Sequence, residues 1–148
     1  MDFDLAQIEP HLKDKKRTWV IISDALRYEV AASLGERLER DTKGQCELNS
    51  MQSVFPSITK CGMAALLPHG SYAYVEGQRG GFDVYVDGMT VPSTSARQKV
   101  LSSHYPGAVA LTYDEFVNVM GRSQRKDAVG DAGVVYLYHN LILSLIHI

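Results

Sequence analysis

The chain has 148 residues, of which 45% are hydrophobic and 22% are charged, and its formal net charge is −2 with histidine neutral. This length suffices for one domain with a hydrophobic core. The composition excludes a disordered chain and offers no basic excess for duplex nucleic acid. The two cysteines have no CxxC spacing and do not indicate a disulfide framework or a structural zinc site. No apolar run reaches the roughly 18–20 residues of a membrane helix, and the acidic, polar start is not a signal peptide, so we expect a cytoplasmic protein.

The first strong element is a short apolar strand that leads directly into a helix. Residues Met1–Lys16 are expected to form a helix or a polar lead-in. Trp19–Ser23 is an apolar run rich in β-branched residues, and this pattern before an amphipathic segment is typical of a buried parallel strand and its crossover helix. The spacing predicts a helix over about Ala25–Arg40, with one apolar stripe that suits packing on a sheet, formed by Leu26, Val30, Leu34 and Leu38.

A second strand and helix are predicted next along the chain. Glu47–Phe55 has apolar residues among mixed neighbours and is predicted as a strand. Pro56 disfavours a helix for the residue before it and suits a turn. Thr59 is a good N-cap for a helix over Lys60–Leu67, and the Pro-His-Gly that begins at Pro68 would stop that helix.

The middle of the chain predicts an antiparallel hairpin. Apolar residues alternate over Tyr72–Thr90, and Gly77–Gly81 supplies the turn. Asp87 and Gly88 form a further turn signal. In the loop Pro92–Ser95, Ser and Thr side chains are able to cap a helix over about Ala96–Ser103.

The last third returns to alternating strands and helices. We predict a short strand at Ala108–Thr112, a helix over Tyr113–Met120, a polar surface segment at Arg122–Asp131 and a buried strand at Val134–Tyr138. This order of elements predicts an α/β fold with a mostly parallel sheet and an inserted hairpin.

Two polar residues follow predicted strands and open predicted helices. Asp24 follows the first strand, and Thr59 follows the second strand through a proline turn. The carboxyl ends of parallel strands share one edge, where ligands bind in α/β folds. A carboxylate there suits a divalent cation, and a hydroxyl at a helix N-terminus is placed for an anion or for activation as a nucleophile. The structural alternative is that both residues are simple N-caps.

Four phrases, in this order, resemble one known family. The chain closely resembles the PglZ family in the phrases VIISDALRYEVAASLGERL, PSITKCGMAALLPH, YVDGMTV and VVYLYHN. PglZ proteins are the phosphatase-like proteins of BREX phage-defence systems and belong to the alkaline phosphatase superfamily. The resemblance spans roughly Arg17–Asn140. It implies a three-layer α/β/α sandwich with a site for two divalent metal ions, zinc or manganese.

The resemblance also implies roles for individual residues. Asp24 occupies the position of a metal ligand. Thr59 occupies the position of the nucleophile, which also binds metal and attacks a phosphorus ester to give a covalent phospho-enzyme. The substrate contacts are predicted from position and not from the resemblance: they are Lys60, which lies beside Thr59, and His139 and Asn140, which follow the last strand. A position on the surface is the alternative for Lys60, and an orienting or core role is the alternative for His139.

The chain departs from the family pattern after Asn140. The family continues with an Asp and further ligands, whereas here Leu141 follows and the chain soon stops. We therefore expect residues 1–142 to be the N-terminal part of a PglZ-type phosphatase domain that is inactive alone. Residues 143–148, LSLIHI, are similar to a translated sequencing adapter.

Three alternatives remain open: two functions of the parent protein, and an unrelated small-molecule-binding α/β domain in which Asp24 and Thr59 are caps only. The first is a metal-dependent phosphatase or phosphodiesterase of a BREX-type defence system. The second is a non-catalytic scaffold or regulatory component of the defence complex. The expected partners are other BREX proteins and a nucleic acid or nucleotide substrate, without a membrane.

Overall fold

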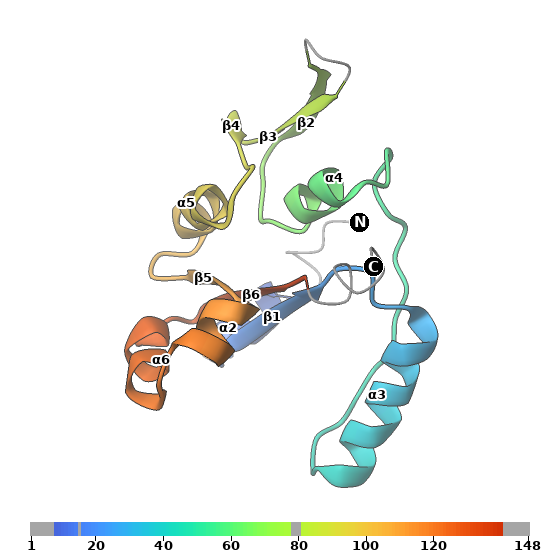
Figure 1. The fold of residues 1–148 in the computed structure, drawn as a ribbon, viewed down its shortest axis with the longest axis vertical. Coiled ribbons are helices and arrows are strands. Elements are labelled where there is room, and N and C mark those ends of the chain that lie inside the picture. Colours follow the sequence, from blue (N-terminus) through green and yellow to red (C-terminus); the bar gives the residue numbers. More distant parts are fainter. Residues whose placement is uncertain (1–7, 15, 78–80, 141–148) are drawn as a thin grey trace.

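The computed structural model describes residues 8–14, 16–77 and 81–140, which form two sheets with helices between and beside them (Figure 1). The elements in chain order are α2 (Glu9–Lys13), β1 (Thr18–Ser23), α3 (Tyr28–Asp41), α4 (Thr59–Ala65), β2 (Tyr72–Glu76), β3 (Phe82–Val86), β4 (Met89–Thr90), α5 (Thr94–His104), β5 (Val109–Thr112), the π-helix η1 (Asp114–Val119), α6 (Arg122–Val129) and β6 (Val134–His139).

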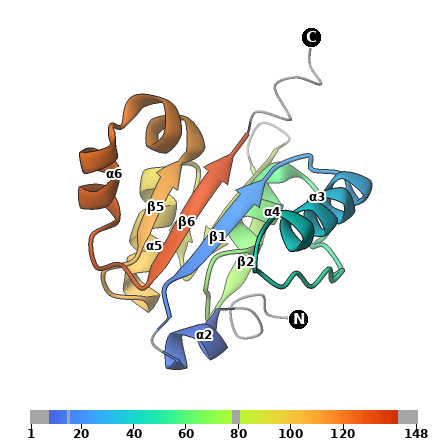
Figure 2. The same cartoon turned by 90° about the horizontal axis from the view of Figure 1, so that it is seen from below.

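Sheet A is parallel and has the strand order β1-β6-β5 (Figure 2). The pairing of β1 with β6 runs from Thr18 opposite Val134 to Ser23 opposite His139. The predicted strands at the two ends of the described chain are therefore parallel neighbours. This confirms a mixed α/β fold with a mostly parallel sheet.

Sheet B is the predicted hairpin with one short strand added. Strands β2 and β3 are antiparallel, and β4 pairs with β3. Asp87 and Gly88 connect β3 to β4 with φ angles of 49° and 76°. A two-residue hairpin turn with positive φ at both positions favours an Asp-Gly pair, so the turn signal in the sequence is confirmed.

Side chains alternate across sheet A and build a core on each face. Val20, Ile22 and Tyr136 pack on one face in a cluster that includes Cys61 of α4 and Val100 of α5. Figure 1 shows that α4 and α5 lie between the two sheets. On the opposite face, a smaller cluster joins β5, β6, η1 and α6, through Val129, Ala132, Val135, Val109, Leu111 and Phe116.

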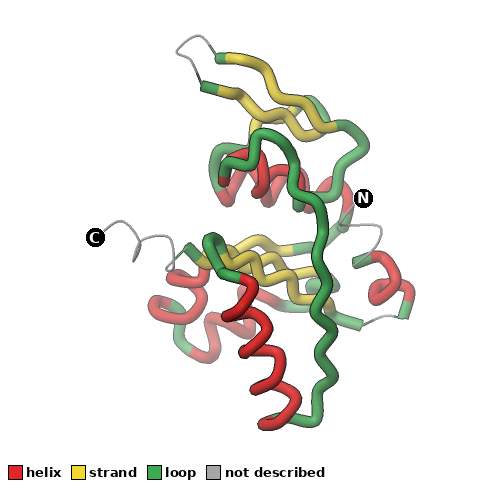
Figure 3. The backbone as a smooth tube through the Cα atoms, turned by 90° about the vertical axis from the view of Figure 1, so that its right-hand side faces the viewer, coloured by secondary structure: helices red, strands yellow, loops and turns green. Residues whose placement is uncertain are grey.

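The helix α3 begins later and is more exposed than the sequence predicts. It starts at Tyr28, not at Ala25, because residues 24 and 25 form a turn after β1. None of its residues is buried, and the predicted packing of the apolar stripe is wrong for the described residues: Val30, Leu34 and Leu38 are 51%, 49% and 43% exposed. The helix extends away from sheet A (Figures 1 and 3).

The predicted strand at Glu47–Phe55 is wrong. The segment from 47 to 54 has no strand pairing, and Figure 3 shows it as a long loop that returns from the far end of α3 to α4. An extended segment becomes a strand only when a neighbouring strand supplies hydrogen-bond partners. Among the described residues, no strand supplies them here.

The structure confirms the predicted cap of α5 and adds a helix that the sequence did not predict. Ser93 caps α5, because its hydroxyl accepts a hydrogen bond of 3.2 Å from the Ala96 amide. Residues 122–129, expected only as polar surface, form the helix α6.

The boundary proposed at residue 142 and the segment 143–148 lie outside the described residues. Within the described part of the chain, no helix is long and apolar enough to span a bilayer.

Candidate functional site

Asp24 lies directly after β1, at the carboxyl edge of sheet A. Its amide donates a hydrogen bond of 3.1 Å to the carbonyl of His139, which extends the ladder between β1 and β6 by one residue. The interpretation of Asp24 as a helix cap is wrong, because Arg27 occupies the N-cap position of α3 and no side chain caps that helix. Asp24 Oδ2 is instead buried without a hydrogen-bond partner.

Backbone strain accompanies this carboxylate. Ala25, the next residue, has a φ of 62°, which is a left-handed conformation that residues other than glycine rarely adopt. Strained backbone of this kind is often found at functional sites. The turn therefore fixes the position of Asp24 at a cost in stability.

Thr59 is the first residue of α4 and not its cap. Ile58 occupies the N-cap position, and no side chain caps this helix. The exposed Thr59 hydroxyl is therefore not used in the way the structural alternative requires. In the described part of the chain, Thr59 and Asp24 form no hydrogen bond with each other.

Tyr136 fixes α4 against the sheet. Its hydroxyl donates a hydrogen bond of 2.9 Å to the carbonyl of Leu66, the residue that ends α4. Cys61 and Met63 of the same helix are buried in the core cluster on this face. The helix that carries Thr59 is thus held on the face of sheet A that includes Ile22.

Lys60 is engaged with the hairpin. Its ammonium group donates hydrogen bonds to the carbonyl of Phe82 and, at 3.3 Å, to the carboxylate of Asp83. Both partners belong to β3. Contact of Lys60 with a substrate stays a prediction, and such a contact would compete with this exposed ion pair.

His139 ends β6 and contacts two polar residues. Its Nδ1 lies 3.0 Å from the hydroxyl of Ser23, and its ring packs edge-on against Tyr113 with ring centroids 4.6 Å apart. These contacts suit the orienting role that was the alternative for His139. Asn140 follows it and is exposed.

The donor set provides a partial fit to a metal ion. Asp24 has a buried carboxylate oxygen without a partner, which is the hard oxygen ligand that divalent cations prefer. However, no group of three or more His, Cys, Asp or Glu side chains gathers in the residues the structure describes. Asp24 and the Thr59 hydroxyl are therefore only part of a complete coordination shell.

The sequence did not reveal a second buried polar pair on the same face. The guanidinium carbon of Arg97 lies 4.8 Å from the centroid of the Tyr138 ring. Arg97 Nε and the Tyr138 hydroxyl are both buried without a hydrogen-bond partner. Burial raises the pKa of Tyr138 to about 12, and the charge of Arg97 opposes this shift. Tyr138 ends an apolar run, so the sequence alone does not separate it from the core residues beside it. The contact with Arg97 of α5 is visible only in the folded chain.

A cleft of about 650 Å³ opens between the 51–54 loop and α4, with His69 and Tyr72 in its lining. Its lining includes none of the residues predicted for the site. Tyr72 donates a hydrogen bond of 3.3 Å to the Cys61 carbonyl, and burial is the main cause that raises the pKa of Tyr72 to about 12. A smaller cleft of about 190 Å³ is lined in part by Lys60 and Asp83.

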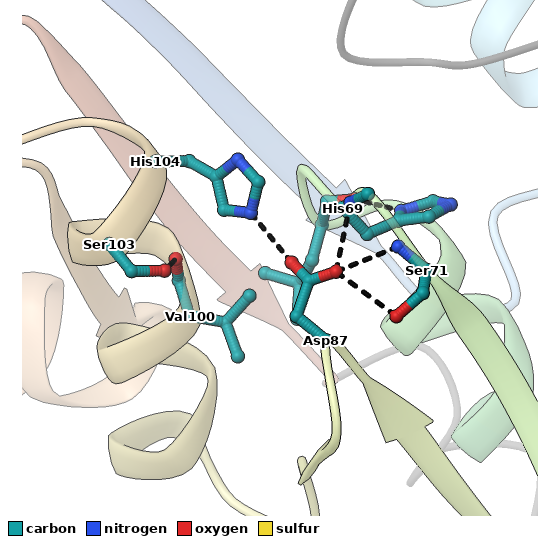
Figure 4. Close-up of polar contacts among 8 residues, drawn as sticks. His69, Ser71, Asp87, Val100, Ser103 and His104 are labelled. Carbon is teal, nitrogen blue, oxygen red and sulfur yellow. Dashed lines mark hydrogen bonds and ion pairs between the residues drawn. The ribbon is translucent and has the colours of Figure 1, made fainter.

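Asp87 is the centre of a separate polar cluster (Figure 4). His104 and Ser71 approach its carboxylate from opposite sides. The Nε2 atom of His104 lies 2.7 Å from Oδ2, and the amides of Gly70 and Ser71 donate to Oδ1 at 2.9 and 2.7 Å. These contacts join the last residue of α5 and the loop before β2 to the turn between β3 and β4.

Comparison with known proteins gives consistent matches. Residues 3–146 match the family model described as the BREX system PglZ alkaline phosphatase-like domain. The chain is 39% identical over 135 residues to the alkaline phosphatase-like protein PglZ of Bacillus cereus (strain H3081.97). This alignment covers 91% of the present chain and 15% of that protein. It is 42% identical over 129 residues to the alkaline phosphatase-like protein BrxZ of Escherichia coli O9:H4 (strain HS). That alignment covers 86% of the present chain and 14% of the BrxZ protein. No solved structure matches the chain.

Proposed function

Because this chain belongs to the PglZ family of alkaline phosphatase-like domains of BREX systems, we propose that its full-length protein is a metal-dependent phosphoric ester hydrolase of phage defence. The chain spans about one seventh of the length of the two relatives, so this function is proposed for the whole protein. The observation that carries the proposal is the buried, unpartnered Oδ2 of Asp24. A carboxylate without a partner is costly to bury, and a bound cation would remove that cost.

Thr59 is the proposed nucleophile. Its oxygen forms a bond to the phosphorus of a phosphate monoester or diester, the bond from phosphorus to the leaving oxygen breaks, and the hydroxyl proton passes to solvent. Water then attacks the same phosphorus, and the bond from phosphorus to the Thr59 oxygen breaks. This step regenerates the hydroxyl and releases inorganic phosphate from a monoester substrate or a phosphate monoester from a diester substrate. Two divalent cations, zinc or manganese, would lower the pKa of the hydroxyl and stabilise the attacking and leaving oxygens.

The remaining ligands are proposed to come from other parts of the full-length protein. Asp24 and Thr59 supply one carboxylate and one hydroxyl, and the described residues offer no cluster of three ligand side chains. We therefore expect the 148-residue chain alone to be inactive. The proposal also includes the complete α/β/α sandwich, because in the described part of the chain the outer face of β1 is uncovered, with Ile21 63% exposed.

Other BREX proteins are the proposed partners, because the matching family model describes a BREX system domain. The proposal also includes a cytoplasmic location and a nucleic acid or nucleotide substrate. Lys60, His139 and Asn140 are proposed to contact that substrate, with Lys60 released from Asp83 when it does so.

The test is hydrolysis of bis(p-nitrophenyl) phosphate by the full-length protein with zinc or manganese. Thr59→Ala should lower kcat at least about a thousandfold, as loss of a nucleophile does, and Asp24→Ala should lower both activity and bound metal. Thr94→Ala is the matched control, because Thr94 is the first residue of α5 as Thr59 is of α4. Absence of hydrolysis with every metal would leave the scaffold or regulatory role as the function.

A further inference from the structure

Arg97 lies on α5 with its guanidinium over the Tyr138 ring. In the part of the chain that the structure describes, no ion pair joins it to a carboxylate. The residue is half-buried, and its Nε is fully buried without a hydrogen-bond partner. Buried arginines in proteins are normally paired, because an unpaired charge loses its hydration. A suitable partner for Arg97 is therefore a negatively charged group whose oxygen atoms accept hydrogen bonds.

The Tyr138 ring holds the guanidinium in place but does not satisfy it. The guanidinium carbon is 4.8 Å from the ring centroid, within the range of a cation–π contact. The face of an aromatic ring supplies no oxygen acceptor, so this contact does not satisfy the N–H groups of the guanidinium. Those groups form the planar fork that binds phosphate or carboxylate oxygens in pairs. Tyr138 is 2% exposed, so the ring is a fixed support.

The pair lies on the same side of sheet A as Asp24. Tyr138 is registered with Ile22, and both belong to the core cluster on the α4 and α5 face. Asp24 follows Ile22 by two residues, and strand alternation places it on this face at the carboxyl edge. Three of the four buried unpartnered polar atoms in the described residues therefore come from this region, namely Asp24 Oδ2, Arg97 Nε and the Tyr138 hydroxyl.

We propose that Arg97 binds a phosphate-type anion, the phosphoryl group of the substrate, and that Tyr138 is its positioning residue. The identity of the anion rests on the proposed hydrolase function, whereas the anion site itself does not. The arrangement separates two tasks, since Asp24 offers an acceptor to a cation and Arg97 offers donors to an anion. Nothing in the sequence pattern of α5 distinguishes Arg97 from Lys99, which is exposed on the same helix.

The test is binding of inorganic phosphate to the full-length protein by isothermal titration calorimetry, which needs no turnover. Arg97→Gln should weaken binding at least tenfold. Lys99→Gln is the matched control and should change the affinity by less than twofold. Arg97→Lys keeps the charge but loses the planar fork, so we expect it to weaken phosphate binding at least threefold. This variant replaces Arg97→Gln in the test if Arg97→Gln does not fold. Tyr138→Phe keeps the ring and should retain the affinity, whereas Tyr138→Leu should weaken it by a similar factor to Arg97→Gln.

Two results would overturn the inference. One is wild-type phosphate affinity in both Arg97 variants, and the other is an equal loss in Lys99→Gln. Steady-state kinetics then separate this inference from the proposed function. Hydrolysis that depends on Thr59 and Asp24, with KM unchanged in Arg97→Gln, refutes only the anion site. Phosphate binding that depends on Arg97 in a protein that hydrolyses nothing refutes only the hydrolase.

Discussion

His104 Nε2 lies 2.7 Å from Asp87 Oδ2, so the last residue of α5 is joined to the turn between β3 and β4. The other oxygen of the carboxylate accepts hydrogen bonds from the Gly70 and Ser71 amides just before β2. Asp87 therefore connects sheet B to the helix that packs on sheet A. The hydrogen bond from His104, followed by those from Ser71 and Gly70, holds the pKa of Asp87 below its ordinary value of 3.8 despite the opposing effect of burial.

Asp87→Asn should destabilise the chain by about 1.5–3 kcal/mol at neutral pH, the usual value of hydrogen bonds to a charged group. A carboxyl whose pKa is lower in the folded state adds stability above its unfolded pKa and loses that contribution as the pH falls through the folded value. The difference between wild type and variant should therefore shrink as the pH drops below 3.8. Urea unfolding followed by fluorescence of Trp19, the single tryptophan, measures it.

Asp83→Asn is the matched control for that experiment. Asp83 belongs to the same sheet, but its ion pair with Lys60 is 3.3 Å long and both side chains are about half exposed. Exposed ion pairs contribute between about 0 and 1 kcal/mol. A loss in Asp83→Asn as large as that in Asp87→Asn, or a difference for Asp87→Asn that does not vary with pH, would contradict the structural role of the cluster.

Ala25→Gly should stabilise the chain by up to about 1 kcal/mol, because glycine adopts a φ of 62° without steric strain. Ala32→Gly should have the opposite effect of about 1 kcal/mol, since Ala32 lies inside α3. Thermal unfolding of the two variants checks the prediction. Destabilisation by Ala25→Gly would show that the left-handed turn after Asp24 does not form.

Ser93→Ala should cost about 1 kcal/mol, because it removes the hydroxyl that caps α5. Thr59→Ala should cost less than about 0.5 kcal/mol in the 148-residue chain, because Thr59 caps nothing. Chemical denaturation of both variants, monitored by circular dichroism, compares them directly. Equal losses would restore the interpretation of Thr59 as a cap.

Ile22→Ala should destabilise the chain by about 2–4 kcal/mol and Ile21→Ala by less than about 1 kcal/mol. The two side chains are identical and adjacent, but Ile22 is 9% exposed in the core and Ile21 is 63% exposed on the outer face of β1. Equilibrium unfolding of the chain separates them. If Ile21→Ala proves as costly as Ile22→Ala, then the outer face of β1 is covered by residues outside the described ranges.

Local signals in the sequence predicted the elements whose physics is local. Trp19–Ser23 and Val134–Tyr138 form strands, as their apolar runs rich in β-branched residues predict. The run in β6 is buried on both faces, whereas β1 buries only the face of Val20 and Ile22. The Asp87-Gly88 turn and the Ser93 cap depend on a few neighbouring atoms, and both were predicted. Asp24 was likewise placed at the carboxyl edge of the sheet, because its position follows from the end of the strand.

What the sequence by itself determined is thus the type of most elements and the place of Asp24. Only the tertiary structure decided which groups find partners. The segment 47–54 has the pattern of a strand but lacks a neighbour, and Asp24 and Thr59 have the residue types of caps but cap nothing. Arg97 meets Tyr138, and His104 meets Asp87, through contacts between elements far apart in the chain. Hydrogen bonds and charges are satisfied in three dimensions, so a pattern along one chain cannot show which atoms are left without a partner.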